Sequence, residues 1–440
     1  MKKIASILKN KEIMNRILFT VLILFIFRIG AQITVPGVNP EGLEEYLNSG
    51  SALSLMNLLG GGTLQTFSIF ALGVSPYITA QIIVQLLSTD VLPALSELKR
   101  QGQYGRRKIE YATRYLTLML GAVQAYGIIK TIENTDNVTL NLDGNWLTYI
   151  YIIVVMLAGS MLVMWLGDQI SVKGIGNGIS IIILVGILAR LPGAFMNEFT
   201  SRLETSQGGL VMLLVEIVIM FAVTAGAVML TQGTRKVPVQ YAKRIVGNKQ
   251  YGGARQYIPL KVNAANVMPI IFAQALMFIP ITLAGFGARQ DAAGVGGWIA
   301  RNFGDMNGVW YNIIYFLMIV AFTYFYTAIT VRPTQMAEEM KKNSGFIPGI
   351  KPGKKTAEYL DSIMSRITLP GSLFLGIVAI LPAFARYFGI NQQFAQFFGG
   401  TSLLITVGVV LDTLQQIETH LMMHHYDGLM KSGKLKGRNR

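Results

Sequence analysis

Residues 209–236 read GLVMLLVEIVIMFAVTAGAVMLTQGTRK, an apolar run that leads directly into a basic loop. The run holds a single charged residue, Glu216, and exceeds the ~20 mostly apolar residues that span a bilayer. The alternation recurs along the 440 residues, and 31 of the 38 lysines and arginines fall in six segments: 1–16, 89–115, 168–177, 232–265, 331–366 and 419–440. Loops rich in Lys and Arg stay on the cytoplasmic side of a membrane. The sequence therefore predicts a protein that crosses a membrane many times.

The composition supports this class. The chain is 52% hydrophobic and 14% charged, whereas a soluble domain carries about 25% charged residues. No cysteine is present, which excludes disulfides, thiolate metal ligands and cysteine nucleophiles. The net charge of +15 has two readings that stay open: a signal for orientation alone, or a docking surface as well. No small-residue cleavage site follows the first apolar run, so we expect a retained first span.

We expect an all-α fold with ten spans and both termini in the cytoplasm. The expected spans are 17–35, 68–88, 111–132, 146–167, 178–192, 209–231, 266–287, 309–331, 367–388 and 400–418. They divide into an N-terminal half, 1–205, and a C-terminal half, 206–440, which ends in a cytosolic tail at 419–440. Five spans in each half, an odd number, place the halves in opposite senses across the membrane.

Four of the expected spans are irregular. The second follows a triple glycine and contains the pair Ser75-Pro76, and the seventh contains two prolines. The fifth starts after a glycine-rich turn and is expected to end at Pro192, and the tenth starts after Gly399-Gly400. Spans two and seven, and five and ten, occupy matching positions in the two halves. Matching interrupted spans are typical of inverted repeats with a working site near the midplane.

Two basic loops are too long to be simple connectors. The composition of 232–265 predicts a β-hairpin. We expect 331–366 to hold a helix at Thr334–Lys342, a Gly/Pro turn and a separate second helix at Thr356–Ser365. Each loop carries seven positive charges, so the two are candidates for one protruding basic surface.

Side chains for enzymatic chemistry are scarce. All three histidines lie in the tail, where His420 and His424 have helical spacing but no third ligand, so we expect no metal site and no cofactor. Neither glycine-rich segment matches a nucleotide-binding motif. The ionisable residues expected in the membrane are few: Arg28, Glu216, Arg386 and Asp412. We expect Glu216 to contact another helix or a partner, and Arg28 to reach the outer interface or a partner.

Neutral polar residues mark the interrupted spans instead. They are Thr79, Gln81, Gln85, Gln124 and Gln274. Amides in lipid are costly unless they meet partners or water. The residues alone leave two readings open: contacts between helices, or a seam that must open.

Several motifs, in order, carry a resemblance that covers essentially the whole chain. They are FSIFALGVSPYITA at 67–80, GRRK at 105–108, GIGNGISIII at 174–183, PLKVN at 259–263, FIPGIKPG at 346–353 and GGTSLLI at 399–405. Together they resemble the SecY family, the central subunits of the bacterial protein-conducting channel. The resemblance implies a signal-sequence-gated channel, not an enzyme, in the bacterial cytoplasmic membrane. Such a channel passes unfolded secretory polypeptides and releases hydrophobic segments laterally into lipid.

The resemblance also implies an hourglass pore, a plug and a lateral gate between spans two and seven. The pore-ring positions fall on Val74, Ile78, Ile179, Ile183, Ile271 and Ile405. The plug covers roughly 53–66 and includes Asn57, Gly60, Gly61, Gly62 and Thr63. Polar positions of the gate fall on Thr79, Gln85, Gln124 and Gln274.

Partners follow from the resemblance as well. They are SecE, SecG, the SecA motor, the ribosome, signal peptides with the nascent polypeptide, and membrane lipid. The docking positions fall on Arg106, Arg107, Arg244, Lys249, Arg255, Lys351, Lys354 and Lys355. The sequence departs from the family at Asn248-Lys249, where two arginines are common, and at Lys351, where arginine is common. Lysine keeps the charge but lacks the bidentate guanidinium.

Two other classes of protein are alternatives to a channel. A secondary transporter also uses inverted repeats and broken helices, but predicts a charged midplane site and needs no docking loops. An intramembrane protease or lipid transferase requires a catalytic histidine or paired acids, which the predicted spans lack.

Overall fold

The computed structural model describes residues 11–38, 42–48, 53–88, 95, 97–98, 101–133, 146–204, 209–241, 244–246, 249–251, 255–285, 302 and 308–431. Within these ranges, eight helices are long and apolar enough to cross a membrane. They are α2 (Lys11–Gly30), α7 (Gln103–Glu133), α8 (Trp146–Lys173), α9 (Gly178–Glu204), α10 (Gly209–Gln232), α13 (Val309–Thr330), α15 (Lys354–Tyr387) and α17 (Gly400–Lys431). The two other predicted spans correspond to α5 (Ser75–Leu86) and α11 (Met268–Gly285). The predicted all-α membrane fold is confirmed.

The second span is interrupted as its sequence indicates. Helix α5 begins only at Ser75, with Pro76 in its first turn. Proline is tolerated there because the backbone N–H that it lacks would have no partner within the helix. Residues 68–74 form turns instead of the predicted helix, and Gly73 has a φ of +54°. Ser160 of α8 donates to the carbonyl of Gly73 over 2.9 Å, which fixes these turns against α8.

Three predicted helix boundaries are wrong. Helix α9 does not end at Pro192 but continues to Glu204, because proline is tolerated inside a membrane helix whose neighbours supply contacts. The predicted helix Thr356–Ser365 is not separate, because α15 runs without a break through Pro370 into the ninth span. In that stretch Thr368 donates to the carbonyl of Met364 over 2.7 Å. Helix α17 likewise extends past the predicted end of the tenth span.

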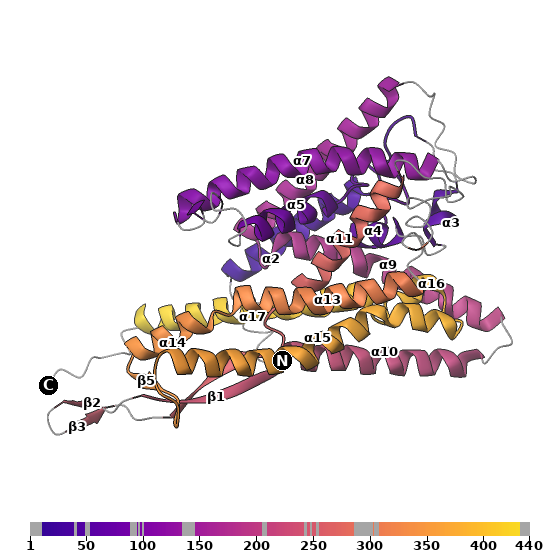
Figure 1. The fold of residues 1–440 in the computed structure, drawn as a ribbon. Coiled ribbons are helices and arrows are strands. Elements are labelled where there is room, and N and C mark those ends of the chain that lie inside the picture. The colour runs from indigo at the N-terminus through magenta and orange to yellow at the C-terminus, as the bar shows by residue number, and fades with distance from the viewer. Residues whose placement is uncertain are drawn as a thin grey trace.

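The helices form two layers in Figure 1. Helices α2, α5, α7 and α8 lie in the upper layer of the view, and α10, α13, α15 and α17 lie in the lower one, with α9 and α11 between them. Short helices α3 (Leu43–Asn48), α4 (Leu53–Gly60) and α16 (Gln392–Ala395) lie at the opposite end of the bundle from the strands. Each layer has its own apolar core, and a third core joins α2, α9, α16 and α17.

Strands extend beyond the helices at one end of the molecule. Strand β1 (Thr234–Tyr241) pairs antiparallel with β4 (Arg255–Lys261) and with β5 (Gly345–Phe346), and β2 (Arg244–Val246) pairs with β3 (Lys249–Tyr251). The predicted hairpin in 232–265 is confirmed. Val239 and Leu260 of this sheet share an apolar core with Met340 of α14 (Pro333–Lys342) and Leu360 of α15. The two long basic loops therefore form one packed unit (Figure 1).

Candidate functional site

The six predicted ring positions belong to one apolar cluster. Val74, Ile183 and Ile405 are buried, with 5%, 3% and 1% of their surface exposed. Ile78, Ile179 and Ile271 are partly buried and pack against the same cluster. These residues come from α5 and the turn before it, α9, α11 and α17. The structure thus brings the irregular spans together around a centre of aliphatic side chains.

The predicted plug is a short helix followed by a turn. Helix α4 ends at Gly60, and Gly61 and Gly62 have φ values of +73° and +94°, which favour glycine. Asn57 is fully buried and closes the turn: its carbonyl accepts from the amide of Gly62 over 2.8 Å, and its Oδ1 from the amide of Gln65 over 3.0 Å. Thr63, also fully buried, lies inside this turn. The described plug residues form a compact unit docked against α9.

The predicted gate residues lie on three helices, α5, α7 and α11. Helix α11 packs against both α5 and α7, so the three helices meet at one seam. Gln274 of α11 is 3% exposed, and its two terminal side-chain atoms have no hydrogen-bond partner within the described residues. The Oε1 atom of Gln124 on α7 is buried without a partner in the same set. Thr79 is satisfied within α5, donating to the carbonyl of Ser75 over 3.1 Å. The seam is closed, but its buried amides are incompletely paired.

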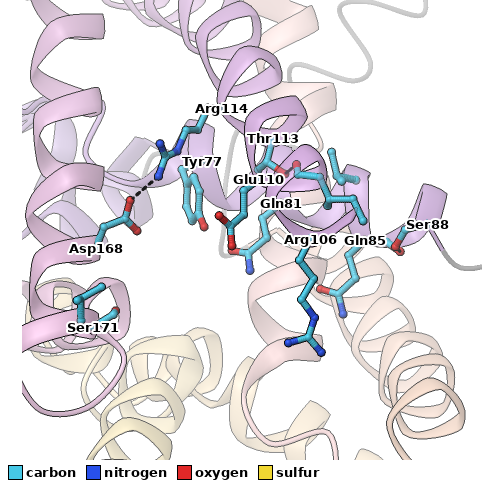
Figure 2. A pocket seen from close by; sticks show the side chains of 13 residues that line it. Tyr77, Gln81, Gln85, Ser88, Arg106, Glu110, Thr113, Arg114, Asp168 and Ser171 are labelled. Atoms are coloured by element: carbon cyan, nitrogen blue, oxygen red, sulfur yellow. Dashed lines mark hydrogen bonds and ion pairs between the residues drawn. The ribbon is translucent and has the colours of Figure 1, made fainter. Parts of the chain in front are cut away.

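Gln85 lies elsewhere, in a cavity of about 830 Å³ between the ends of α5, α7 and α8 (Figure 2). One side is the α5 face that carries Gln81 and Gln85. The other is a charged stripe on α7, where Arg114 pairs with Asp168 of α8 over 3.0 Å. Arg106, predicted as a docking residue, lines this cavity too. This cavity was not predicted, although the charges at positions 106, 110 and 114 share one face of a helix.

A buried charge cluster was also missed. Arg202 of α9 donates through Nε to Glu198 over 2.8 Å and through Nη2 to Glu216 of α10 over 2.5 Å. Both carboxylate side chains are 1% exposed, and that of Arg202 is 8% exposed. Glu198 further accepts from the amide of Asn391, before α16. The expected helix contact of Glu216 is confirmed, and the spacing of Glu198 and Arg202 was the available signal.

The predicted docking residues are exposed where they are described. Lys351, Lys354 and Lys355 lie in the turn after β5 and at the start of α15, on the packed unit of the two loops. Arg106 and Arg107 are exposed in the first turns of α7, on a different element. Arg244, Lys249 and Arg255 fall in β2, β3 and β4, but their side chains lie outside the described part of the chain.

Metal ligands do not gather in the part of the chain that the structure describes. No group of three or more His, Asp or Glu residues there is arranged to hold an ion. His420 lies on α17, and the side chain of His424 is outside the described residues.

The chain is similar to known proteins over most of its length. A family model for SecY matches residues 68–414. The chain belongs to the SecY family. Protein translocase subunit SecY of Halalkalibacterium halodurans is 43% identical over 440 residues, covering 98% of this chain and all of the relative. Protein translocase subunit SecY of Bacillus subtilis is 43% identical over 435 residues, with the same coverage.

Solved channels share the SecY-family fold. A structure described as a protein-conducting channel aligns with a TM-score of 0.66 and 18% identity, covering 93% of each chain. Sec61 in a canine ribosome-channel complex from the endoplasmic reticulum aligns with a TM-score of 0.63 and the same identity and coverage. The resemblance seen in the motifs is confirmed, and the protein is a multi-pass membrane protein of this family.

Proposed function

We propose that this SecY-family protein is a protein-conducting channel that passes unfolded secretory polypeptides across the membrane and releases apolar segments sideways into lipid. One observation carries the proposal. Six aliphatic side chains from four irregular spans converge on a single apolar centre, next to a plug-like helix and a seam between α11 and the pair α5 and α7.

An aliphatic constriction suits a polypeptide channel. Val74, Ile183 and Ile405 offer no fixed charge or polar group to hold an ion, and a narrow apolar pore excludes water by dewetting. An extended chain of any sequence can still push between such side chains, because they make no specific bonds that must break. The constriction would therefore seal against ions without selecting a particular polypeptide.

The seam suits lateral release. The buried Oε1 atom of Gln124 and both terminal side-chain atoms of Gln274 lack partners within the described residues, so part of the seam gains little from staying closed. A signal sequence is an apolar helix, and its insertion between α5 and α11 would replace helix contacts with equivalent ones. Opening then needs no chemistry on the chain itself.

The energy for transport has to come from a partner. We propose that the packed unit of the two long loops docks the SecA motor and the ribosome through Lys351, Lys354 and Lys355, which are exposed on it. Ribosomal RNA is a polyanion, so such contacts would weaken with rising salt. One solved structure with this fold is described as a ribosome-channel complex, which supports the ribosome as partner. SecE, bracing the two halves, and a SecG-type subunit complete the proposed assembly.

The proposed setting is the bacterial cytoplasmic membrane, with both termini in the cytoplasm. The charge distribution supports this orientation, because the segments rich in Lys and Arg alternate with short loops poor in them. We further propose two inverted halves, 1–205 and 206–440. Their irregular helices α5 and α11 both face the seam, which agrees with matched positions in two repeats.

Transport in vesicles tests the proposal. The protein is reconstituted with SecE and a SecG-type subunit, SecA and ATP are added, and protection of a labelled secretory precursor from protease is measured. We expect protection that requires ATP and a functional signal sequence. Vesicles that fail to protect the precursor, or that instead take up one small solute selectively, would contradict the channel and favour a transporter.

A further inference from the structure

Two arginines in membrane-spanning helices hold the turn of the plug at residues 61–65, called its tip below. Arg28 of α2 donates through Nη1 to the carbonyl of Gly61 over 3.0 Å. Arg190 of α9 donates through Nη2 to Oε1 of Gln65 over 3.1 Å. The two guanidinium groups therefore reach one short turn from two different helices, 33 and 125 residues away from it in the sequence.

The base of the plug, residues 67–69, is held mainly by main-chain hydrogen bonds. The amide of Val35 donates to the carbonyl of Phe67, and the amide of Ile69 donates to the carbonyl of Ile33, both over 3.0 Å. These bonds tie the end of the plug to the segment that follows α2. The hydroxyl of Thr66 adds a bond to the carbonyl of Ala31 over 3.1 Å, and the amide of Ser68 donates to the carbonyl of Thr63 over 2.9 Å. These bonds hold the base, and the residues before Thr63 are left to the contacts of the turn and of Arg28.

The contact surface of the tip is shaped for release as well as for docking. A Cβ on Gly61 would lie 2.6 Å from the Cα of Gly186 in α9, so the two backbones touch without intervening side chains. Within the described residues, the buried atoms Asn57 Nδ2 and Thr63 Oγ1 have no hydrogen-bond partner. A buried donor or hydroxyl without a partner destabilises the state that buries it. The docked tip therefore combines a close fit, two charge-assisted bonds and two unsatisfied atoms.

We infer that Arg28 and Arg190 are positioning residues that latch the plug in the closed channel. The inference rests on the proposed channel function and assigns its seal to particular side chains. Each arginine supplies a charged donor to a neutral acceptor, which is a stronger bond than a neutral pair provides. Leaving the closed position breaks both bonds together, so the plug would move as a unit about its main-chain base. The glycines at 60–62 then have two roles: they allow the backbone conformation of the docked turn, and they would let the turn change conformation when the plug moves.

Leak of a small anion from vesicles tests this latch. The complex is reconstituted without precursor, and the rate of anion efflux is compared for the unaltered protein, Arg28→Gln, Arg190→Gln and the double variant. Loss of one charge-assisted bond is expected to shift the equilibrium about tenfold toward the undocked plug. We expect each single variant to leak several-fold faster, and the double variant faster still. Efflux equal to that of the unaltered protein in all three variants would overturn the latch.

Three further variants separate the latch from misfolding. Gln65→Ala removes the acceptor of Arg190 without altering a spanning helix, and should leak as Arg190→Gln does, with no further increase when the two are combined. Additive leak would overturn the proposed bond. Arg28→Lys keeps a charged donor and should leak less than Arg28→Gln; equal leak would count against the bond to Gly61. Arg114→Gln, which breaks an exposed ion pair away from the plug, should leave the seal intact.

Transport of a normal precursor distinguishes the two proposals. If the latch is correct, the leaking variants still protect the precursor from protease, and they also accept a precursor with a weakened signal sequence. If the unaltered protein protects no precursor, the proposed channel function fails. If the unaltered protein transports but the variants neither leak nor accept the weakened signal, the latch alone fails.

Discussion

The guanidinium of Arg202 donates to Oε1 of Glu216 over 2.5 Å, across the connection from α9 to α10. Glu198 accepts from Nε of the same guanidinium, so two buried carboxylates share one buried cation. The cluster also reaches the segment before α16, because Arg202 donates to the carbonyl of Gly389 over 3.1 Å. Three elements from both halves of the chain are thereby joined at one point.

Removing the cation and removing one carboxylate should have unequal effects. Arg202→Gln leaves two buried carboxylates without their partner and should lower the free energy of unfolding by about 3–5 kcal/mol. Glu216→Gln leaves the bond between Arg202 and Glu198 and removes the surplus negative charge, so its cost should be well below that. Thermal unfolding in detergent measures both. Arg114→Gln is the matched control, because its exposed pair with Asp168 contributes at most about 1 kcal/mol. Equal losses for Arg202→Gln and Glu216→Gln would contradict this account of the cluster.

A glycine in α8 makes room for the turns before α5. A Cβ on Gly159 would lie 1.8 Å from the carbonyl oxygen of Ile69, which belongs to the backbone and cannot easily move aside. Gly159→Ala should therefore displace residues 69–74, lower the unfolding midpoint and disturb Val74 in the ring. Gly193→Ala is the control, since a Cβ there meets nothing within 4 Å, and it should be neutral or stabilising by up to about 1 kcal/mol. A Gly159→Ala protein as stable as the control would show that α8 does not hold these turns.

Features of this architecture that depend on neighbouring residues in the sequence can be predicted from it, whereas features that depend on contacts between distant helices cannot. The spans follow from runs of apolar residues, and the late start of α5 is visible in Ser75-Pro76, because these signals are local. The ring residues were assigned through family motifs, since a branched aliphatic residue in a membrane helix is not distinctive by itself.

The wrong helix boundaries and the missed contacts depend on packing between helices that are distant in the sequence. The fifth span was expected to end at Pro192, and the helix at Thr356–Ser365 was expected to be separate from the ninth span. Helices α9 and α15 continue through Pro192 and Pro370 because packing on neighbouring helices outweighs the lost backbone bond. The contacts of Arg28 with Gly61 and of Arg202 with Glu216 depend on how helices pack, which composition and periodicity do not encode. The cavity that Gln85 lines in Figure 2 likewise depends on how α5, α7 and α8 pack, and its assignment to the gate through the family motifs stays a prediction.

Replacing Gln274 by an apolar residue should make the seam open less readily. Gln274→Leu has a similar volume and removes two buried atoms that lack partners within the described residues. It should stabilise the closed seam by about 1–3 kcal/mol and slow initiation of precursor transport. The lag before precursor protection measures this effect. Faster initiation than in the unaltered protein would show that the amide holds the seam closed.

Charge reversal on the loop unit should weaken partner docking. Lys351 is exposed in the turn after β5, so Lys351→Glu should reduce SecA-driven transport without reducing the amount of protein in the membrane. Binding to ribosomes should also become weaker and less dependent on salt, because one phosphate contact is lost. Lys173→Glu, at the end of α8 and outside this unit, provides a control of equal charge change. Unchanged transport in the Lys351 variant would remove this residue from the docking surface.

The most direct test asks whether a polypeptide passes between the ring residues. The chain has no cysteine, so Ile183→Cys and Ile405→Cys each introduce a single thiol at the centre of the apolar cluster. A secretory precursor with one cysteine is stalled during transport, and disulfide formation with each variant is measured. We predict strong crosslinks at both positions and none at Phe221→Cys, which is 69% exposed on α10. Absence of crosslinks at Ile183 and Ile405 while the precursor is stalled in transit would contradict the proposed path.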